Sequence, residues 1–162
     1  MNFKETQRFN RPWHYAIYAL ICLLTIGVSI GVYIFANKSI ESAIAGFVAF
    51  GIVSFFWFSM RLETQIDSAG VHYRYFPFHR KTRLLKWEDI ESINVKQYSP
   101  FSDYGGWGLR FKILNFNDIL LNVSGNKGIR IELKSGKKFM IGTQEDTLAI
   151  ESINSLKTNY QD

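Results

Sequence analysis

Two long apolar runs stand at the start of the chain, and a longer stretch of alternating apolar and polar residues follows them. Residues 15–35 contain no charged side chain, and residues 40–60 contain only Glu41, near their start. About 20 apolar residues in a helix cross a hydrocarbon core of about 30 Å, because each residue rises about 1.5 Å. The short polar break between the runs therefore predicts a transmembrane helical hairpin over residues 15–60.

A cleaved secretion signal is the alternative interpretation of the first run. However, the apolar stretch is too long for such a signal, no small-residue cleavage site follows it, and the second run comes directly after. Neither run carries an ionisable group at mid-depth, which argues against a transporter or a proton pathway. The hairpin is therefore interpreted as an anchor.

Basic residues that flank the runs predict the orientation of this anchor. Lys4, Arg8, Arg11 and Arg61 lie on one side, whereas only Lys38 lies on the other. Because cytoplasmic flanks carry the excess of Lys and Arg, both termini of a multi-pass protein of the plasma (inner) membrane are predicted to be cytoplasmic. This divides the chain into a basic cytoplasmic N-terminus (1–14), the hairpin (15–60) and a cytoplasmic domain (61–162).

From residue 61 the alternation has the two-residue period of β-strands. After Thr143 the apolar spacing becomes that of an amphipathic helix of about 14 residues. A curled antiparallel sheet with this helix over one open end accounts for the pattern. Seven strands are predicted, over residues 62–67, 71–76, 84–95, 109–113, 119–123, 129–134 and 137–142.

Composition narrows the function classes. The net charge is +5, but part of the excess lies beside the apolar runs, which argues against a nucleic-acid-binding face on the domain. The single cysteine, Cys22, lies within the first run and is interpreted as a small apolar residue. His14, His72 and His79 are scattered, so no metal site or cofactor is predicted. No acid/base pair or nucleophile motif is recognised, so no catalytic residue is assigned and the chain is predicted not to be an enzyme.

Several short motifs carry a resemblance to a known architecture: Ile66-Asp67-x-x-Gly70-Val71-x-Tyr73-Arg74, Trp87–Ile90, Tyr104-Gly105-Gly106-Trp107-Gly108-x-Arg110, Gly125–Gly128 and Ile141–Thr143. Together with the strand and helix pattern they resemble bacterial membrane-anchored proteins with a pleckstrin-homology (PH)-like barrel. The resemblance implies an α+β protein with an N-terminal two-helix transmembrane hairpin. A seven-stranded antiparallel PH-like β-barrel with a C-terminal capping helix would follow it.

This resemblance does not imply phosphoinositide binding. Lipid-binding PH domains place Lys and Arg around a long first hairpin loop. The matching loop here is only Ser68-Ala69-Gly70 and has no basic residue. No phosphoinositide site is therefore expected at that position.

The run Tyr104–Arg110 is the first candidate site. Three glycines around Trp107 predict unusual backbone angles and an aromatic ring held in place by them. One interpretation is a contact surface for a ligand or partner, made of Tyr104, Gly105, Gly106, Trp107 and Arg110. The other is that Trp107 closes one end of the barrel and the glycines make room for it.

The second candidate site is a local group of basic residues, Arg74, Arg80, Lys81 and Arg83. On a tethered domain each such residue near an anionic membrane contributes about 1 kcal/mol of attraction. The alternative is a solvated hairpin tip without a partner.

Two classes of function follow. The first is an integral membrane protein that presents a PH-like interaction module at the cytoplasmic face, where it binds a protein partner, a second copy of itself or the membrane surface. The alternative is an accessory subunit or minor enzyme of envelope metabolism with a site in the barrel. Besides the lipid bilayer, the sequence identifies no partner, and nucleic acid is not expected.

Overall fold

The computed structural model describes residues 2–35, 40–112 and 115–157. They fall into two compact units: a helical unit, Phe9–Met60, and a β-rich unit made of Met1–Arg8 and Arg61–Asp162. The β-rich unit is therefore assembled from both sides of the helical unit in sequence, and each unit is described in turn.

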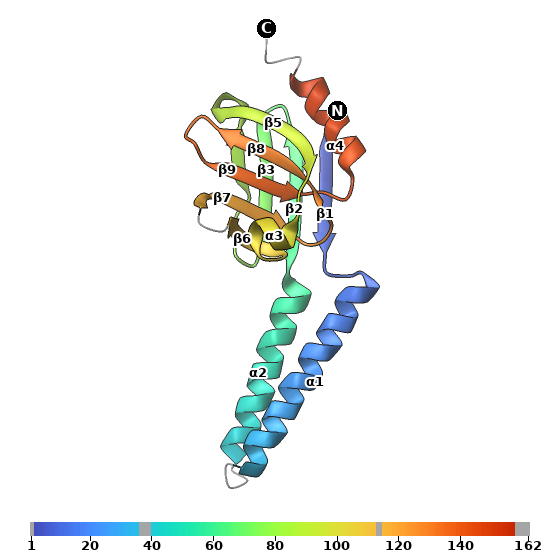
Figure 1. Cartoon of the computed structure of the whole chain (residues 1–162), viewed down its shortest axis with the longest axis vertical. Coiled ribbons are helices and arrows are strands. Elements are labelled where there is room, and N and C mark those ends of the chain that lie inside the picture. The colour runs from blue at the N-terminus through green and yellow to red at the C-terminus, as the bar shows by residue number, and fades with distance from the viewer. Residues whose placement is uncertain (1, 36–39, 113–114, 158–162) are drawn as a thin grey trace. The chain divides into compact units, whose positions relative to one another are not determined.

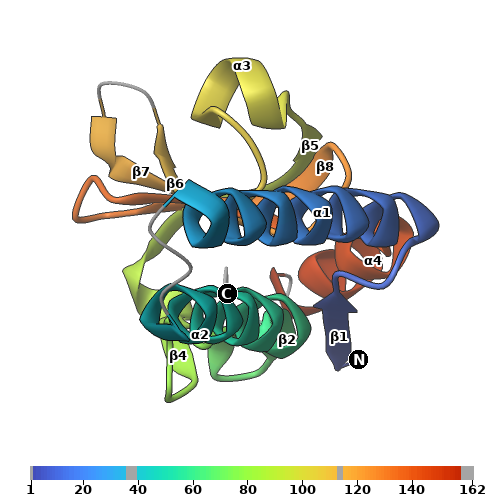
Figure 2. The same cartoon turned by 90° about the horizontal axis from the view of Figure 1, so that it is seen from below.

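The helical unit consists of α1 (Pro12–Phe35) and α2 (Ile40–Ser59), which lie side by side (Figures 1 and 2). The Tyr18 hydroxyl hydrogen-bonds to Ser54 Oγ at 2.7 Å across the pair. Gly46 of α2 faces Ser29 of α1 so closely that a Cβ atom there would lie 2.5 Å from Ser29 Oγ. Glycine at this position therefore sets how near the two backbones approach.

By length and composition, the helix that is long and apolar enough to cross a membrane is α1, with a mean hydropathy of 2.3. In α2 the apolar stretch within the described residues is Ile44–Ser59. Of the two predicted spans, 15–35 and 40–60, the structure therefore supports the first; the second span, and with it the transmembrane hairpin, is not shown.

The first sheet of the β-rich unit contains β1 (Phe3–Arg8), β2 (Arg61–Asp67), β3 (Gly70–Phe76) and β4 (Arg83–Lys86), antiparallel and in that order. Arg8 pairs with Arg61, and Arg61 pairs with Phe76. These three residues define one end of the sheet, called here the linker end. At this end the chain leaves β1 for α1 and returns from α2 into β2.

The second sheet has the order β5-β8-β9-β7-β6. Its strands are β5 (Ile90–Gln97), β6 (Gly108–Lys112), β7 (Asn115–Asn122), β8 (Lys127–Leu133) and β9 (Lys138–Gly142). The β7–β9 pair is parallel and the other pairs are antiparallel. Figure 1 shows these strands crossing those of the first sheet.

Buried side chains from both sheets form the core. Leu62 and Ile66 come from the first sheet, and Leu120, Ile131 and Ile141 come from the second. Three helical segments complete the unit: the 3₁₀ turn η1 (Trp87–Asp89), the short helix α3 (Pro100–Tyr104) and the C-terminal helix α4 (Asp146–Lys157). The buried face of α4 carries Ala149, Ile153 and Leu156, and the helix packs on β1, β2, β5 and β8.

The α+β class is confirmed, but the seven-stranded antiparallel closed barrel is wrong. The described residues form two separate sheets with nine strands and one parallel pair. The predicted strand 84–95 is broken by η1, so that β4 and β5 belong to different sheets. The 3–8 strand was not predicted, because its inward positions are Phe3, Glu5 and Gln7, and polar inward residues hide the alternation.

Those polar residues hydrogen-bond β1 to the end of β9 and to the connection between β9 and α4. The buried Glu5 carboxylate accepts hydrogen bonds from Thr143 Oγ1 at 2.6 Å and from the Gln144 N–H at 2.9 Å. The Gln7 amide donates to the Gly142 carbonyl at 2.7 Å. Burial raises the pKa of Glu5, although both bonds act against this rise. The polar side of β1 therefore holds the two sheets and α4 together.

We expect Glu5→Ala to lower the free energy of unfolding by about 1–3 kcal/mol, because the buried Thr143 hydroxyl and the part-buried Gln144 N–H lose their acceptor. Lys4→Ala, on the outward face of the same strand, should change it by less than about 0.5 kcal/mol. Denaturation of the full chain in detergent micelles, followed by tryptophan fluorescence, measures both. Equal effects of the two substitutions would contradict the fastening role of Glu5.

Candidate functional site

The glycine-rich run of the first candidate site follows directly from α3. Ser99 begins this helix, its Oγ accepting a bond from the Ser102 N–H at 3.4 Å, and Gly105 ends it with φ 74°. Gly106 and Gly108 also have positive φ, 133° and 106°. A side chain at any of these three positions would be strained, so the run needs glycine for its backbone alone.

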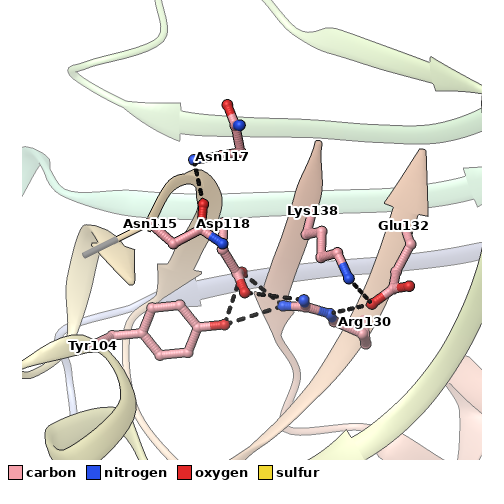
Figure 3. Close-up of polar contacts among 7 residues, drawn as sticks. All are labelled: Tyr104, Asn115, Asn117, Asp118, Arg130, Glu132 and Lys138. Carbon is pink, nitrogen blue, oxygen red and sulfur yellow. Dashed lines mark hydrogen bonds and ion pairs between the residues drawn. The ribbon is translucent and has the colours of Figure 1, made fainter. Parts of the chain in front are cut away.

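Tyr104 ends α3 and points into the unit, where it meets a buried ion pair (Figure 3). Arg130 binds the Asp118 carboxylate with two hydrogen bonds, Nη1 to Oδ1 at 2.6 Å and Nη2 to Oδ2 at 2.9 Å. The Tyr104 hydroxyl donates to Asp118 Oδ1 at 2.9 Å and accepts from Arg130 Nη1 at 3.2 Å. Asp118 and Arg130 are only 2% and 7% exposed, so both charges depend on each other and on Tyr104.

The ion pair also fixes the order of the strands. Asp118 lies on β7 and Arg130 on β8, and β9 lies between these strands. Burial alone would raise the pKa of Asp118, but the bonds from Arg130 and Tyr104 outweigh it and leave the pKa lowered. The pair therefore stabilises the fold above the ordinary pKa of aspartate, and this contribution is lost only as the pH falls through the lowered value.

Arg130 continues into a second ion pair at the edge of this cluster. Its Nε lies 3.4 Å from Glu132 Oε1, which Lys138 also binds at 3.2 Å (Figure 3). The lysine is the main cause of the lowered pKa of Glu132. The Asp118–Arg130 pair was not predicted, because the sequence pattern places Asp118 in a turn before the strand 119–123, whereas it lies on β7, and because the two residues come from different strands.

The remaining residues of the first candidate site lie nearer the surface. Trp107 is half-buried, and its ring meets Phe101 edge to face at 4.5 Å between centroids. Phe101 itself is 59% exposed. Arg110 is exposed and its Nε donates to the Trp107 carbonyl at 3.2 Å. Tyr104 is thus a buried structural residue, whereas Trp107 and Arg110 face a surface that another molecule can reach.

The second candidate site also contains one residue that is held by the fold and others that are exposed. Arg74 is bound by Glu63 through two hydrogen bonds of 2.9 and 2.8 Å across β2 and β3. Arg80, Lys81 and Arg83 are exposed. They belong to the β3–β4 connection and the first residue of β4, so the exposed cations are grouped at one hairpin tip.

This hairpin tip also carries an exposed phenylalanine that sequence analysis did not single out. Phe78 is 55% exposed and stacks on Tyr75 at 5.9 Å. His79, by contrast, is buried, and its Nδ1 accepts a hydrogen bond from the Tyr75 N–H at 3.4 Å. Burial, and in smaller part the charge of Arg83, lower the pKa of His79. The tip therefore contains a buried histidine that is bonded to the Tyr75 backbone, together with exposed cations and an exposed aromatic ring.

Tyr75 brings the two candidate sites together. Its side chain is fully buried, and its hydroxyl donates to the Asn122 carbonyl of the second sheet at 3.4 Å. A Cβ atom at Gly108 would lie 3.8 Å from that hydroxyl. Tyr75 also neighbours Phe76 of the linker end and supports Phe78. The start of β6, the hairpin tip and the linker end are thus neighbours around one tyrosine.

Two more exposed phenylalanines lie along β6 and β7. Phe111 is 48% exposed and Phe116 is 80% exposed, with their ring centroids 5.9 Å apart. β6 is an edge strand of its sheet. The sequence pattern did not single them out, because Phe111 falls at an apolar position of the predicted strand 109–113 and Phe116 falls between two predicted strands. Phe101, Trp107, Phe111 and Phe116 are called here the aromatic face.

The described residues contain no group of three side chains able to hold a metal ion. The buried Asp118, Arg130 and Tyr104 satisfy one another, and in the described residues no nucleophile lies against them. Their arrangement is that of a structural cluster. Comparison of the chain with models of protein families, with curated protein sequences and with solved structures gave no match.

Removing one partner of the buried ion pair should be costly. We expect Asp118→Leu to lower the free energy of unfolding by about 3–5 kcal/mol, because the Arg130 charge is left buried without its counter-charge. The double variant Asp118→Leu/Arg130→Met should be more stable than this single variant. Asn117→Ala, at an exposed neighbouring position, is the control, and chemical denaturation in micelles is the measurement. A double variant less stable than the single variant would contradict this account.

A pH dependence follows from His79. Because its pKa is lower in the folded chain than the ordinary 6.5, the unfolded chain binds the proton more readily. Stability should therefore fall as the pH is lowered from 7.5 to 5.5. In His79→Gln, whose side-chain oxygen can still accept the Tyr75 N–H bond, this loss should shrink. Thermal unfolding at each pH measures it, with His72→Gln as the control.

Proposed function

We propose that this chain is an integral membrane protein whose cytoplasmic β-rich unit docks on the anionic surface of the bilayer that holds it. The observation that carries the proposal is the grouping of the exposed Phe78 with the exposed cations Arg80, Lys81 and Arg83 at the hairpin tip that follows Phe76 of the linker end. Three further points support it: the topology of the chain, the length of its linkers and the chemistry of the exposed side chains.

Topology supports two membrane crossings. β1 precedes α1, and β2 follows α2, yet β1 and β2 are paired over their whole length. Strands of one sheet lie on the same side of a membrane. If α1 crosses, the chain has to return, and α2 is the segment available for this. The short apolar stretch of α2 then crosses with Ile40, Glu41 and the following turn at the interface, at a modest cost in hydrophobic mismatch.

Linker lengths support a position of the linker end near the bilayer. One residue, Met60, separates α2 from β2, and three residues separate β1 from α1. An extended residue spans at most about 3.6 Å. Arg61 therefore lies within about 7 Å of the end of α2. Arg8 and Arg11 lie in or beside the other linker, and this excess of positive charge supports the cytoplasmic side for both termini.

The exposed side chains have the chemistry of a membrane interface. Arg80, Lys81 and Arg83 can attract an anionic leaflet with about 1 kcal/mol each. Phe78 beside them, and the aromatic face along β6, can insert rings at headgroup depth. Phosphoinositide recognition is not part of the proposal, since Ser68–Gly70 carries no cation.

The proposed relationship to membrane-anchored PH-like proteins concerns the order of the parts. Paired apolar helices precede a sheet-rich unit, and a C-terminal helix follows the last strand. Two sheets that do not close are a departure from the expected barrel. A protein partner is the second candidate occupant, and the exposed Phe101 on Trp107 is the observation that favours it.

The test places an environment-sensitive fluorophore at Phe78→Cys, in full-length chain whose Cys22 is replaced by Ala, reconstituted in vesicles. We expect a blue shift in vesicles with about one-third anionic lipid and none in purely zwitterionic vesicles. Because surface charges are screened over about 3 Å at 1 M salt, the shift should disappear there. Arg80→Glu/Lys81→Glu should abolish it.

The matched control is Lys134→Glu/Lys137→Glu, which reverses two exposed cations at the β8–β9 turn. It should leave the shift unchanged. A shift that depends neither on anionic lipid nor on Arg80 and Lys81 would overturn membrane docking. A shift that appears only when a cell extract is added would favour the protein partner instead.

A further inference from the structure

A small polar hollow lies beside the buried ion pair, with Arg130 and Tyr104 in its wall. Its volume is about 130 Å³. It is lined by residues from β5, α3, β6, β8 and β9: Lys96, Gln97, Tyr98, Asp103, Tyr104, Lys112, Arg130 and Met140. Neither predicted site included it, because its walls come from five separate elements.

The charges around the hollow favour an anion. Lys96 and Lys112 are exposed, and in the described part of the chain neither forms an ion pair. One carboxylate, that of Asp103, also lines the hollow. Its Oδ2 accepts a hydrogen bond from the Ser99 N–H at 3.0 Å and so holds the start of α3. Two lysines that form no ion pair in the described residues therefore line one cavity, together with the carboxylate of Asp103, and the charge of Lys112 also helps to lower the pKa of the nearby Asp118.

Arg130 adds a rigid wall. A guanidinium has five N–H groups. The bonds to Asp118, Tyr104 and Glu132 use four of them, two on Nη1, one on Nη2 and one on Nε. The second hydrogen of Nη2 lies beside the Nε–H, on the side of Glu132, so no donor of Arg130 is assigned to the hollow. Because Asp118 already offsets the charge of Arg130, the net attraction for an anion comes mainly from the lysines.

The volume limits what can enter. At about 30 Å³ per water molecule, the hollow has room for about four waters. It is much smaller than the roughly 300–1,000 Å³ of pockets for drug-sized ligands. One tetrahedral oxyanion therefore fits, and a whole nucleotide or sugar does not.

We propose that this hollow binds a phosphate group, with Lys96 and Lys112 as its charged ligands and Arg130 in its wall. Free phosphate and the phosphomonoester headgroup of a lipid share this chemistry. Since Asp103 and Tyr104 line the same hollow, a bound phosphate lies beside α3. The site does not depend on the docking surface of Phe78 and its neighbouring cations, and it stands if that docking fails.

The experiment titrates inorganic phosphate into the full chain in maltoside micelles, which contain no phosphate, at constant ionic strength made up with chloride. We expect saturable binding by isothermal calorimetry and a rise in unfolding temperature. Lys96→Gln/Lys112→Gln should weaken binding at least tenfold, and both residues are exposed, so the fold should persist. Lys134→Gln/Lys137→Gln is the matched control and should bind like the unchanged chain.

Two further arms identify the source of the phosphate. Phosphatidic acid in nanodiscs that competes with inorganic phosphate would assign the hollow to a lipid headgroup. Binding of inorganic phosphate without such competition would assign it to a soluble ligand. Heat and stability changes no larger than those given by chloride would overturn the proposal, as would unchanged affinity in Lys96→Gln/Lys112→Gln. Neither result depends on the fluorescence shift at position 78, so this proposal and membrane docking can fail separately.

Discussion

The pairing of β1 with β2 is the constraint on which the rest of this structure depends. It joins a strand that precedes the helical unit to one that follows it, so the chain has to leave and re-enter the same sheet. Backbone bonds alone would leave β1 as a replaceable edge strand. Glu5 and Gln7 prevent this, because their side chains reach the start of α4 and the end of β9. Polar bonds at the edge thus define where the helices are attached.

The sequence predicted those parts of the fold whose pattern is local. Apolar length predicted α1, and the two-residue period predicted β2, β3 and β8 within a few residues. Two features had no local signal. The inward residues of β1 are mostly polar, and the parallel β7–β9 pairing depends on strand order, which alternation does not specify. The barrel was expected from the number of strands, the C-terminal helix and the resemblance of the motifs, although sheet closure also depends on which edge strands meet.

The sequence also predicted some candidate residues correctly as surface residues and did not distinguish them from others that have partners within the fold. Residue type and grouping identified Trp107, Arg110 and the cations of the hairpin tip, which do lie at the surface. Residue type and grouping did not show that Tyr104 and Arg74 are bound by charged side chains of the fold. Each of these two is bound by a charged partner on another strand or beyond, Asp118 for Tyr104 and Glu63 for Arg74. Exposure of a side chain is decided by such distant partners, and a single sequence does not show them.

Tyr104 links the stability of the unit to its surface chemistry. Its hydroxyl is held by Asp118 and Arg130, and the same residue lines the hollow together with Lys96 and Lys112. The glycines that follow it carry the chain from this buried point to the half-buried Trp107 within three residues. A ligand in the hollow would therefore lie against α3, and α3 carries Phe101 of the aromatic face. The proposed anion site and the aromatic face thus share one short helix, whose Asp103 and Tyr104 line the hollow.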